Sequence, residues 1–386
     1  MKKILRFLSY VLVAALASSL TLAMTTPQET TVPTQSKLDQ LSQLIQEQFI
    51  GAVDVTAMED AAAAAMVGAL GDRWSHYISA EEYSSYVAQM QNSYVGIGIT
   101  ITVHEDGIGY NITQVAEGGP AEEAGIQPGD IVIGAAGQRF ENVVDTTQSN
   151  VIRGDEGTTV EILVLRAGEE LTFQVERRVI KTVAAKGQML PGNVGYVVIS
   201  NFHLGSARET IAAVEELMKQ GAQALLFDVR NNPGGYVSEL VDALDYLLPE
   251  GLLFRSVDYL GNERRDESDE NFVNLPMAVL VNSESYSAAE FFAAAIREYE
   301  AGFVAGTQTC GKGYYQITVT LKDGSAVALS MGKYFTPKGV SLEQVGVTPD
   351  RTVTVDEETA SAIYYGTLPS AEDPQIQAAL SGLLEK

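Results

Sequence analysis

The spacing pattern of apolar residues changes once along this chain, near residue 182. This change in pattern constrains the fold more than any other feature. From about Tyr94 to Ile180, short runs of β-forming residues are separated by turns of Gly, Pro and Asp, which predicts a compact β-rich module. After about Thr182, strands alternate with helices, which predicts an α/β layer with crossover connections. The sequence therefore predicts a multidomain protein with one β part and one α/β part.

Within the α/β part, individual elements can be placed. Residues 195–199, 224–229 and 278–281 have the composition of strands, and helices are expected over about 236–248 and 287–299. Ser206 and Glu209 have the spacing of a capping box that opens a further helix. Before the β module, the apolar spacing of Leu38, Leu41 and Leu44 and an Ala-rich stretch at 57–70 predict a small helical lead-in.

The amino terminus has the pattern of an export segment. Lys2, Lys3 and Arg6 precede an uncharged run over 7–24, followed by a Thr, Pro and Gln-rich tether that ends at Ser36. A run of this length fits a cleaved signal peptide or an uncleaved membrane anchor, and both remain open. In either case we expect the rest of the chain to lie outside the cytoplasm.

Charge and composition exclude several classes of function. With 25 Lys and Arg against 50 Asp and Glu, the net charge of −25 has the wrong sign for a nucleic-acid partner. The single cysteine, Cys310, cannot form an internal disulfide, and three dispersed histidines show no metal-ligand spacing. We expect no metal and no cofactor.

Ser287 is a candidate nucleophile because it lies where a strand turns into a helix, beside free helix N-terminal amides. Ser287 and Glu290 also have the spacing of an ordinary capping box, which is the structural alternative. No histidine lies in a recognisable partner motif, so Lys312 in a Gly-rich stretch is the candidate base, although an exposed loop lysine has the same pattern. A lysine base must be neutral near pH 7, which burial could achieve. Gln316 could hydrogen-bond it.

Two glycine-containing segments could bind a substrate through their backbone. Residues 228–235 run from a strand through a polar turn into a helix, which is typical of an oxyanion hole and equally of a tight connection. Gly96-Ile97-Gly98-Ile99 has the pattern of a loop that receives a peptide carboxylate, with the next strand pairing to the peptide.

Together these segments resemble the carboxyl-terminal processing peptidases, exported serine enzymes with a Ser/Lys pair and an embedded PDZ domain. The resemblance runs from about Leu38 to the end of the chain and depends on motifs in the family's order. These are residues 71–77, 96–99, 120–125, 128–130, 228–235, 285–290, 311–316, 346–350 and 373–377.

The resemblance implies a role for each matching residue. The nucleophile matches Ser287, the general base Lys312, at a spacing of 312 − 287 = 25, and the orienting glutamine Gln316. Backbone amides near Gly235 and of Ala288 would form the oxyanion hole, and residues 96–99 would receive the substrate's carboxylate. Arg153 resembles an arginine that couples peptide binding to the protease core. Tyr286, Ala289 and Cys310 depart from the family's usual residues, which puts substrate preference in doubt.

The expected function is that of an exported serine endopeptidase that recognises polypeptides with free, apolar C-termini and cuts upstream. The expected parts are a leader over 1–25, a tether over 26–36, a helical lead-in over 37–92, a PDZ domain over 93–181, an α/β protease core over 182–350 and a peripheral C-terminal tail over 351–386 that packs on the core. The alternatives are a catalytically silent PDZ adaptor and an assembly protein that uses its N-terminal helices as a partner surface. A homodimer is compatible with the protease.

Overall fold

A computed structural model describes residues 36–385. The expected leader and residues 26–35 of the expected tether lie outside the described residues. Within residues 36–385, no helix is both long enough and apolar enough to cross a membrane. The chain divides into two compact units, the first ending at Ala62.

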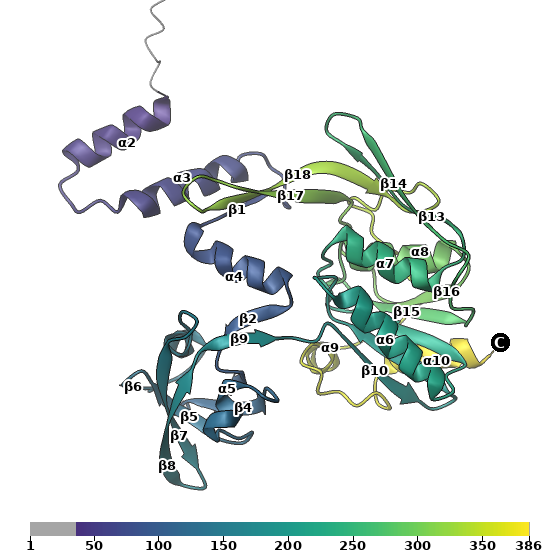
Figure 1. Ribbon diagram of the computed structural model, residues 1–386, viewed down its shortest axis with the longest axis horizontal. Coiled ribbons are helices and arrows are strands. Elements are labelled where there is room, and N and C mark those ends of the chain that lie inside the picture. Colours follow the sequence, from purple (N-terminus) through teal and green to yellow (C-terminus); the bar gives the residue numbers. More distant parts are fainter. Residues whose placement is uncertain (1–35, 386) are drawn as a thin grey trace, which may run out of the picture. The chain divides into compact units, whose positions relative to one another are not determined.

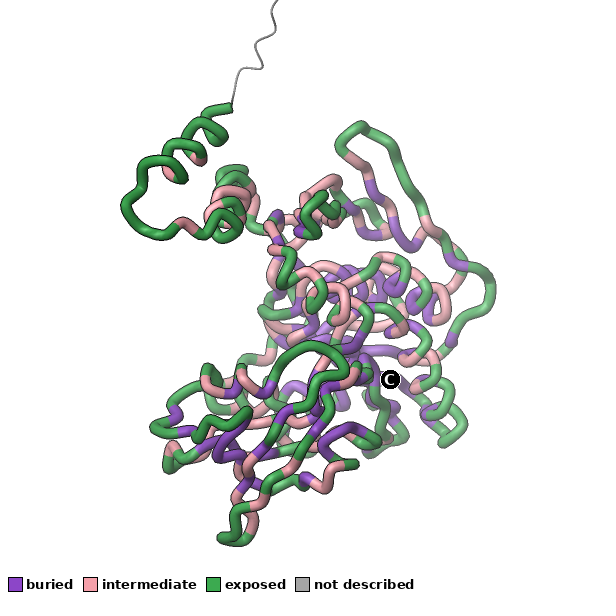
Figure 2. The backbone as a smooth tube through the Cα atoms, turned by 60° about the vertical axis from the view of Figure 1, so that its left-hand side comes forward, coloured by how far each residue is buried: buried purple, intermediate pink, exposed green. Residues whose placement is uncertain are grey.

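Helices form where the apolar spacing near the amino terminus predicts them. They are α2 (Lys37–Gln48) and α3 (Val55–Gly68). Ser36 caps α2 through its hydroxyl, which accepts a hydrogen bond of 3.1 Å from the Asp39 amide. Neither helix has a buried residue, and their backbone is coloured as exposed or intermediate in Figure 2. Leu41 and Leu44 of α2 are 49% and 50% exposed.

The β module is an antiparallel sheet around its own apolar core. Its strands lie in the order β3 (Ile99–Val103), β4 (Tyr110–Val115), β5 (Ile131–Ala135), β7 (Thr159–Arg166) and β8 (Glu169–Glu176), with β6 (Gln138–Arg139) beside β5. Two short helices, α5 (Pro120–Ala124) and η1 (Thr147–Ile152), complete it. Tyr110, Ile112 and Ile162 belong to its buried core. Because β3 ends the strand order, its outer edge has no partner strand within residues 36–385.

The second part is built on a six-stranded sheet, which explains why its strands read as continuous apolar runs. The order is β10 (Ala185–Leu190), β11 (Val194–Ile199), β12 (Ala224–Asp228), β15 (Met277–Val281), β16 (Gly302–Gly306) and β19 (Arg351–Thr352). β10 is antiparallel to β11, and the remaining pairs are parallel. The segments that follow β12 and β15 therefore meet at one edge, where the Asn231 amide donates to Asn282 Oδ1 at 2.9 Å.

Helices cover both faces of this sheet. α6 (Ser206–Lys219), α7 (Val237–Leu247) and α8 (Ala288–Glu298) share one core with alternate strand residues, and α10 (Pro374–Leu384) shares a second core with the others (Figure 1). Phe227 thus packs toward the first layer and Leu226 toward the second. The result is a three-layer α/β/α core.

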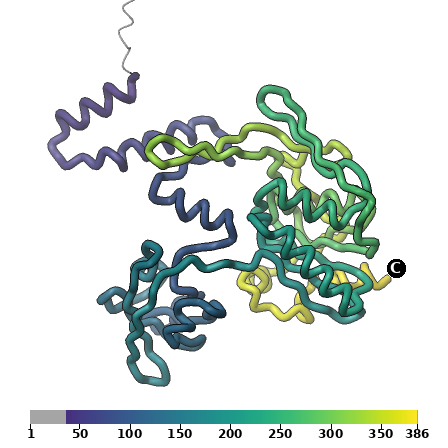
Figure 3. The backbone as a smooth tube through the Cα atoms, viewed as in Figure 1, coloured from purple at the N-terminus to yellow at the C-terminus, as the bar shows by residue number. Residues whose placement is uncertain are grey.

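Two details differ from the sequence prediction. The C-terminal residues pack on the core as expected, but they are less peripheral than predicted, because Ile376, Leu380 and Leu383 of α10 form part of the second core. The course of this segment beside the central strands can be followed in Figure 3. A helix does begin at Ser206, but Gly205 is its N-cap, and Glu209 instead accepts from the Ala184 amide at 2.7 Å. Sequence spacing identified the helix but not its cap.

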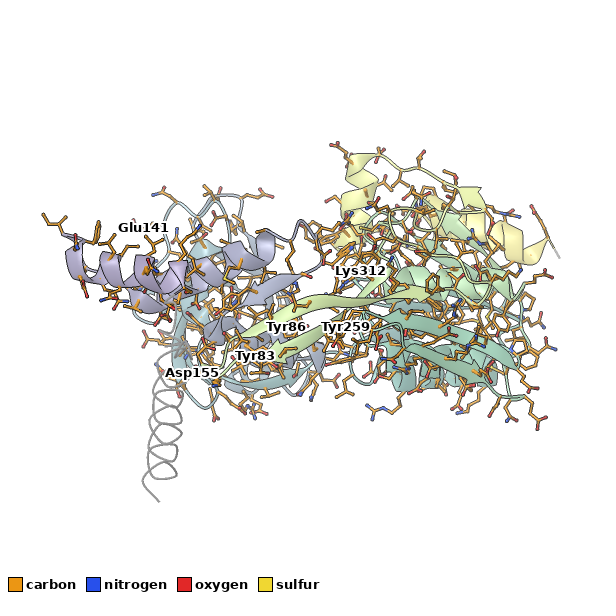
Figure 4. All side chains as sticks on the ribbon, turned by 90° about the horizontal axis from the view of Figure 1, so that it is seen from above. Tyr83, Tyr86, Glu141, Asp155, Tyr259 and Lys312 are labelled. Atoms are coloured by element: carbon orange, nitrogen blue, oxygen red, sulfur yellow. The ribbon has the colours of Figure 1, made fainter. Side chains whose placement is uncertain are left out.

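The remaining strands form a second sheet and a ribbon. The sheet has the order β1 (His76–Ile78), β18 (Ala326–Phe335), β13 (Gly251–Asp258) and β14 (Glu263–Ser268), with β17 (Tyr314–Thr320) also paired to β18. β2 (Ser93–Gly96) and β9 (Arg178–Lys181) pair as the chain enters and leaves the β module, and α9 (Glu357–Tyr364) precedes α10. Helix α4 (Ala80–Met90) contacts the β17–β18 hairpin: the hydroxyls of Tyr83 and Tyr86 lie 3.1 and 3.2 Å from those of Thr320 and Thr318. Both tyrosines are labelled in Figure 4.

Candidate active site

Ser287 lies at the amino terminus of α8, directly after the turn that follows β15. Its backbone has φ 59° and ψ −121°, a region that residues with a side chain seldom adopt. Such a conformation costs about 1–3 kcal/mol and persists only where the surrounding structure imposes it. The strained turn places Ser287 in the wall of a cavity of 690 Å³ at the edge of the central sheet.

The loop after β12 passes directly beside Ser287. At Gly234, with φ 87°, an added Cβ would lie 2.8 Å from Ser287 Cβ, and at Gly235 it would lie 2.2 Å from the carbonyl oxygen of Phe202. Only glycine therefore allows this approach. Within residues 36–385, the amides of Gly235 and Ala288 have no hydrogen-bond acceptor. Two free N–H groups beside a serine can stabilise an oxyanion.

Lys312 contributes a partly buried side chain to the same cavity. Burial lowers the pKa of Lys312 from 10.5 to about 8, against the opposite effect of Asp72, Cys310, Glu290 and Glu343. The lysine is labelled in Figure 4. A pKa near 8 leaves part of the lysine population neutral at pH 7, as a general base requires.

Aromatic rings surround the Lys312 amino group. Its Nζ lies 4.8 Å from the centre of the Trp74 ring and 5.8 Å from that of Tyr286. Those two rings stack with 6.0 Å between their centres. Within residues 36–385, Nζ makes no hydrogen bond to Ser287 or to any other residue, so the rings are the main contacts of the amine.

The other predicted catalytic residue, Gln316, lines the same cavity but does not contact the lysine amine. Its Nε2 donates to the Tyr314 carbonyl at 3.1 Å and to Ser330 Oγ at 3.0 Å. His203 also lines the cavity, and its ring bonds the backbone carbonyl of Gln89. Burial lowers the pKa of His203. Neither residue is hydrogen-bonded to Ser287.

Sequence reasoning missed two residues at the site. Trp74 lies in the 71–77 motif, but nothing in that motif indicates a contact with Lys312. Tyr334 is buried, donates its hydroxyl to the Lys312 carbonyl and interacts with the Ser287 side chain. No sequence signal identified Tyr334, because β18 is an ordinary apolar strand by composition.

A second candidate binding site lies at the start of the β module. The Ile97 and Gly98 amides have no acceptor within residues 36–385, and Gly98 has φ 83°. The exposed edge of β3, which begins at Ile99, continues from this loop. Gly96 pairs with Arg178 in the β2–β9 ribbon. The combination suits a peptide carboxylate followed by a pairing strand.

Arg153 follows η1 and is exposed. Among residues 36–385, its side chain has no hydrogen-bond or ion-pair partner. The nearby buried arginine is Arg177, which donates to the Ile152 carbonyl at 2.8 Å.

Comparison with known proteins identifies both parts of the chain. The pattern of Peptidase family S41 matches residues 193–353, and that of the PDZ domain matches residues 95–176. Carboxy-terminal processing protease CtpA of Bacillus subtilis is 30% identical over 361 residues, covering 90% of this chain and 77% of the relative. The chain belongs to the carboxyl-terminal processing protease family.

Further similarities support this assignment. A carboxyl-terminal-processing protease of Synechocystis is 29% identical over 332 residues, covering 84% of this chain and 75% of the relative. The solved structure of a photosystem II D1 C-terminal processing protease is 27% identical with a TM-score of 0.50, covering 88% of this chain and 93% of that one. The predicted family and fold class are confirmed. This protease is a serine-type peptidase with an α/β core and a PDZ domain, and its substrates are polypeptides.

The approach of Gly234 to Ser287 generates a first prediction. Gly234→Ala should lower turnover about 100-fold or more if Ser287 reacts with substrate, because the new methyl group would displace Ser287. Gly221→Ala is the matched control, since Gly221 also has a positive φ, 95°, but nothing within 4 Å of an added Cβ. It should lose about 1 kcal/mol of stability and keep its turnover. Equal losses of turnover in both variants would show that backbone strain alone is responsible.

The buried lysine should also destabilise the fold at neutral pH. A pKa lowered from 10.5 to about 8 means that the folded state binds a proton less tightly than the unfolded state does. This penalty is complete below pH 8 and disappears as pH rises toward 10.5. Lys312→Met should therefore raise the free energy of unfolding by about 3 kcal/mol at pH 7.

Urea unfolding of the wild type and of Lys312→Met at pH 7 and pH 10.5 measures the predicted difference in the free energy of unfolding. The stability gain of Lys312→Met should shrink at the higher pH, whereas Lys219→Met on the exposed end of α6 should change stability by less than about 0.5 kcal/mol at both. A gain that is independent of pH would contradict a lowered pKa.

Proposed function

We propose that this protease binds the free C-terminus of a polypeptide through its PDZ domain and cuts an upstream peptide bond with Ser287 and Lys312. One observation carries the proposal. A serine on a strained helix N-cap, two free amides and a lysine with a pKa of about 8 line one cavity. This set contains a nucleophile, an oxyanion site and a base.

In the proposed reaction, neutral Lys312 accepts the Ser287 proton as Oγ attacks the scissile carbonyl. The amides of Gly235 and Ala288 donate hydrogen bonds to the resulting oxyanion. The lysine ammonium then gives its proton to the leaving amine, the C–N bond breaks, and an ester to Ser287 forms. Water, deprotonated by the lysine, attacks this ester and releases the shortened polypeptide. Gln316 would orient Lys312 after its side chain exchanges its present hydrogen bonds, to Tyr314 and Ser330, for one to the lysine.

The PDZ domain would supply the substrate preference. The free amides of Ile97 and Gly98 would bind the terminal carboxylate, the edge of β3 would pair with the preceding residues, and apolar C-terminal side chains would face the module's core. Arg153, exposed beside η1, would couple this event to the core. An arginine without a present partner is available for such a contact.

We further propose that the protease acts outside the cytoplasm, on the basis of the basic and then uncharged segment at its amino terminus. That segment is a cleaved signal or an anchor. The exposed apolar face of α2 supports a homodimer, because such a face is commonly covered by a partner.

The proposed roles of Ser287 and Lys312 predict the effects of substituting them and the pH dependence of cleavage. Ser287→Ala and Lys312→Ala should each lower kcat at least about 1000-fold, because the two residues act as a unit. In the wild type, kcat/KM should rise with pH through a midpoint near 8, as Lys312 loses its proton. Peptide cleavage measured by mass spectrometry checks both. Near-normal turnover of Lys312→Ala would eliminate it as the base.

The carboxylate-binding role is tested with paired substrates. An unstructured polypeptide with an apolar C-terminus should be cut about 10- to 100-fold more efficiently than its C-terminally amidated form, since amidation removes a charge-assisted hydrogen bond. Equal cleavage would contradict recognition of the carboxylate. Binding that needs the free carboxylate but leads to no cleavage would favour the adaptor.

A further inference from the structure

We propose that Glu290 is a positioning residue that holds the Ser287-bearing helix and the Lys312-bearing loop at a fixed separation. The inference rests on the proposed function, because it assigns a second task to the site of the Ser/Lys pair. Glu290 lies in the first turn of α8 and is fully buried. Its side chain does not line the cavity, so it acts through its neighbours and not on substrate.

Both carboxylate oxygens of Glu290 join the two segments. Oε2 accepts from the Ser287 amide at 3.0 Å and from the Lys312 amide at 2.8 Å. Oε1 accepts from the Gly311 amide at 2.7 Å and from Thr309 Oγ1 at 2.5 Å. A single carboxylate therefore contacts the backbone of the nucleophile and that of the base.

In an ordinary capping box, the carboxylate accepts hydrogen bonds only from the N-cap residue, and not from a distant loop. Glu82 occupies the same position in α4, yet it accepts only from the amide and hydroxyl of Ser79, at 3.3 and 2.8 Å, and it is exposed. Three of the four donors to Glu290 come from residues 309–312, which lie 19–22 positions away in the sequence. Glu290 thus caps a helix and also anchors a distant loop.

The chemistry of the site requires a carboxylate here. A glutamine has one oxygen and one NH₂ group, so its nitrogen would replace a carboxylate oxygen that accepts from two donors, at least one of them a backbone amide. Burial raises the pKa of Glu290, and all four hydrogen bonds oppose that rise by favouring the ionised form. Substitution by glutamine should therefore separate the two segments slightly while the surrounding core remains packed.

Glu290 also contributes to the charge around the lysine. The charged and titratable groups that act on Lys312 are Asp72, Cys310, Glu290 and Glu343, and each favours its protonated form. The rings of Trp74 and Tyr286 pack against the amine. The Tyr334 hydroxyl donates a hydrogen bond to the Lys312 carbonyl. Burial and the negative charge of Glu290 both raise the pKa of Tyr334. Loss of the Glu290 charge should consequently move the Lys312 titration to lower pH.

The test compares Glu290→Gln with the wild-type chain in a peptide-cleavage assay from pH 6 to 10. We expect kcat to fall about 100-fold with KM changed less than about threefold, because positioning is lost while the binding surfaces stay in place. The midpoint of the acidic limb of kcat/KM should move to lower pH, because the Glu290 charge favours the protonated form of Lys312. Normal kcat, or a lower kcat with an unmoved midpoint, would overturn the proposal.

Two controls separate this role from loss of stability. Glu82→Gln removes an equivalent capping group, and Glu239→Gln alters another buried carboxylate, which accepts from the Gly205 and Ala207 amides at 2.9 Å each. Both should lower the unfolding midpoint without moving the pH profile. If Glu239→Gln shifted the profile as far as Glu290→Gln does, the shift would reflect general loosening and the proposal would fail.

A second variant separates geometry from charge and remains informative if the glutamine variant does not fold. Glu290→Asp keeps the charge but is one methylene shorter, so it cannot reach both segments. It should lower kcat with the pH midpoint near the wild-type value, and an unchanged kcat would contradict the positioning role. Ser287→Ala and Lys312→Ala, assayed in parallel, test the proposed function separately. If those variants keep activity, the catalytic pair is wrong whatever Glu290 does.

Discussion

The burial of α8 is the constraint on which the active site depends. Every residue from Ala288 to Ile296 is buried, and Phe292 packs against Phe202 and Phe227 from two other elements. A helix enclosed on all sides cannot shift without opening cavities, which cost several kcal/mol for a large side chain. The position of its amino terminus is therefore fixed by the core. The strain at Ser287 is tolerated because the helix that follows it has no other place to lie.

A buried ionic network anchors the loop that passes beside Ser287. Arg230, 8% exposed, donates to Asp228 Oδ1 at 2.9 Å and to Asp373 Oδ2 at 2.8 Å, and Gln375 accepts a further bond of 2.9 Å. A buried guanidinium needs all of these partners, since removing one leaves an uncompensated charge. The network ties the loop that carries Gly235 to the start of α10. This connection explains why the C-terminal segment is integral to the core.

The features of the site that could be predicted from the sequence are those encoded by short contiguous motifs. The strand-to-helix turn at Ser287, the Gly-rich stretch at Lys312 and the family's motif order are all contiguous, so each is visible without a structure. The direction of a side chain is not encoded in this way. The side chain of Gln316 donates a hydrogen bond to Ser330 on the neighbouring strand. The Lys312 amine packs on the ring of Trp74, which is more than two hundred residues away in the sequence. Such contacts follow from tertiary packing, as does the role of Asp373, and no spacing rule predicts them.

The contact between Lys312 and Trp74 links the protonation state of the base to its position. In a chain of net charge −25, the surrounding carboxylates favour the ammonium form, and burial lowers the pKa in spite of them. An ammonium is attracted to the face of an aromatic ring, whereas a neutral amine is not. Loss of the Lys312 proton, which the proposed base would need, therefore also weakens its contact with Trp74. In the proposed reaction, the neutral amine that would accept a hydrogen bond from Ser287 is thus the form that is less attracted to the Trp74 ring.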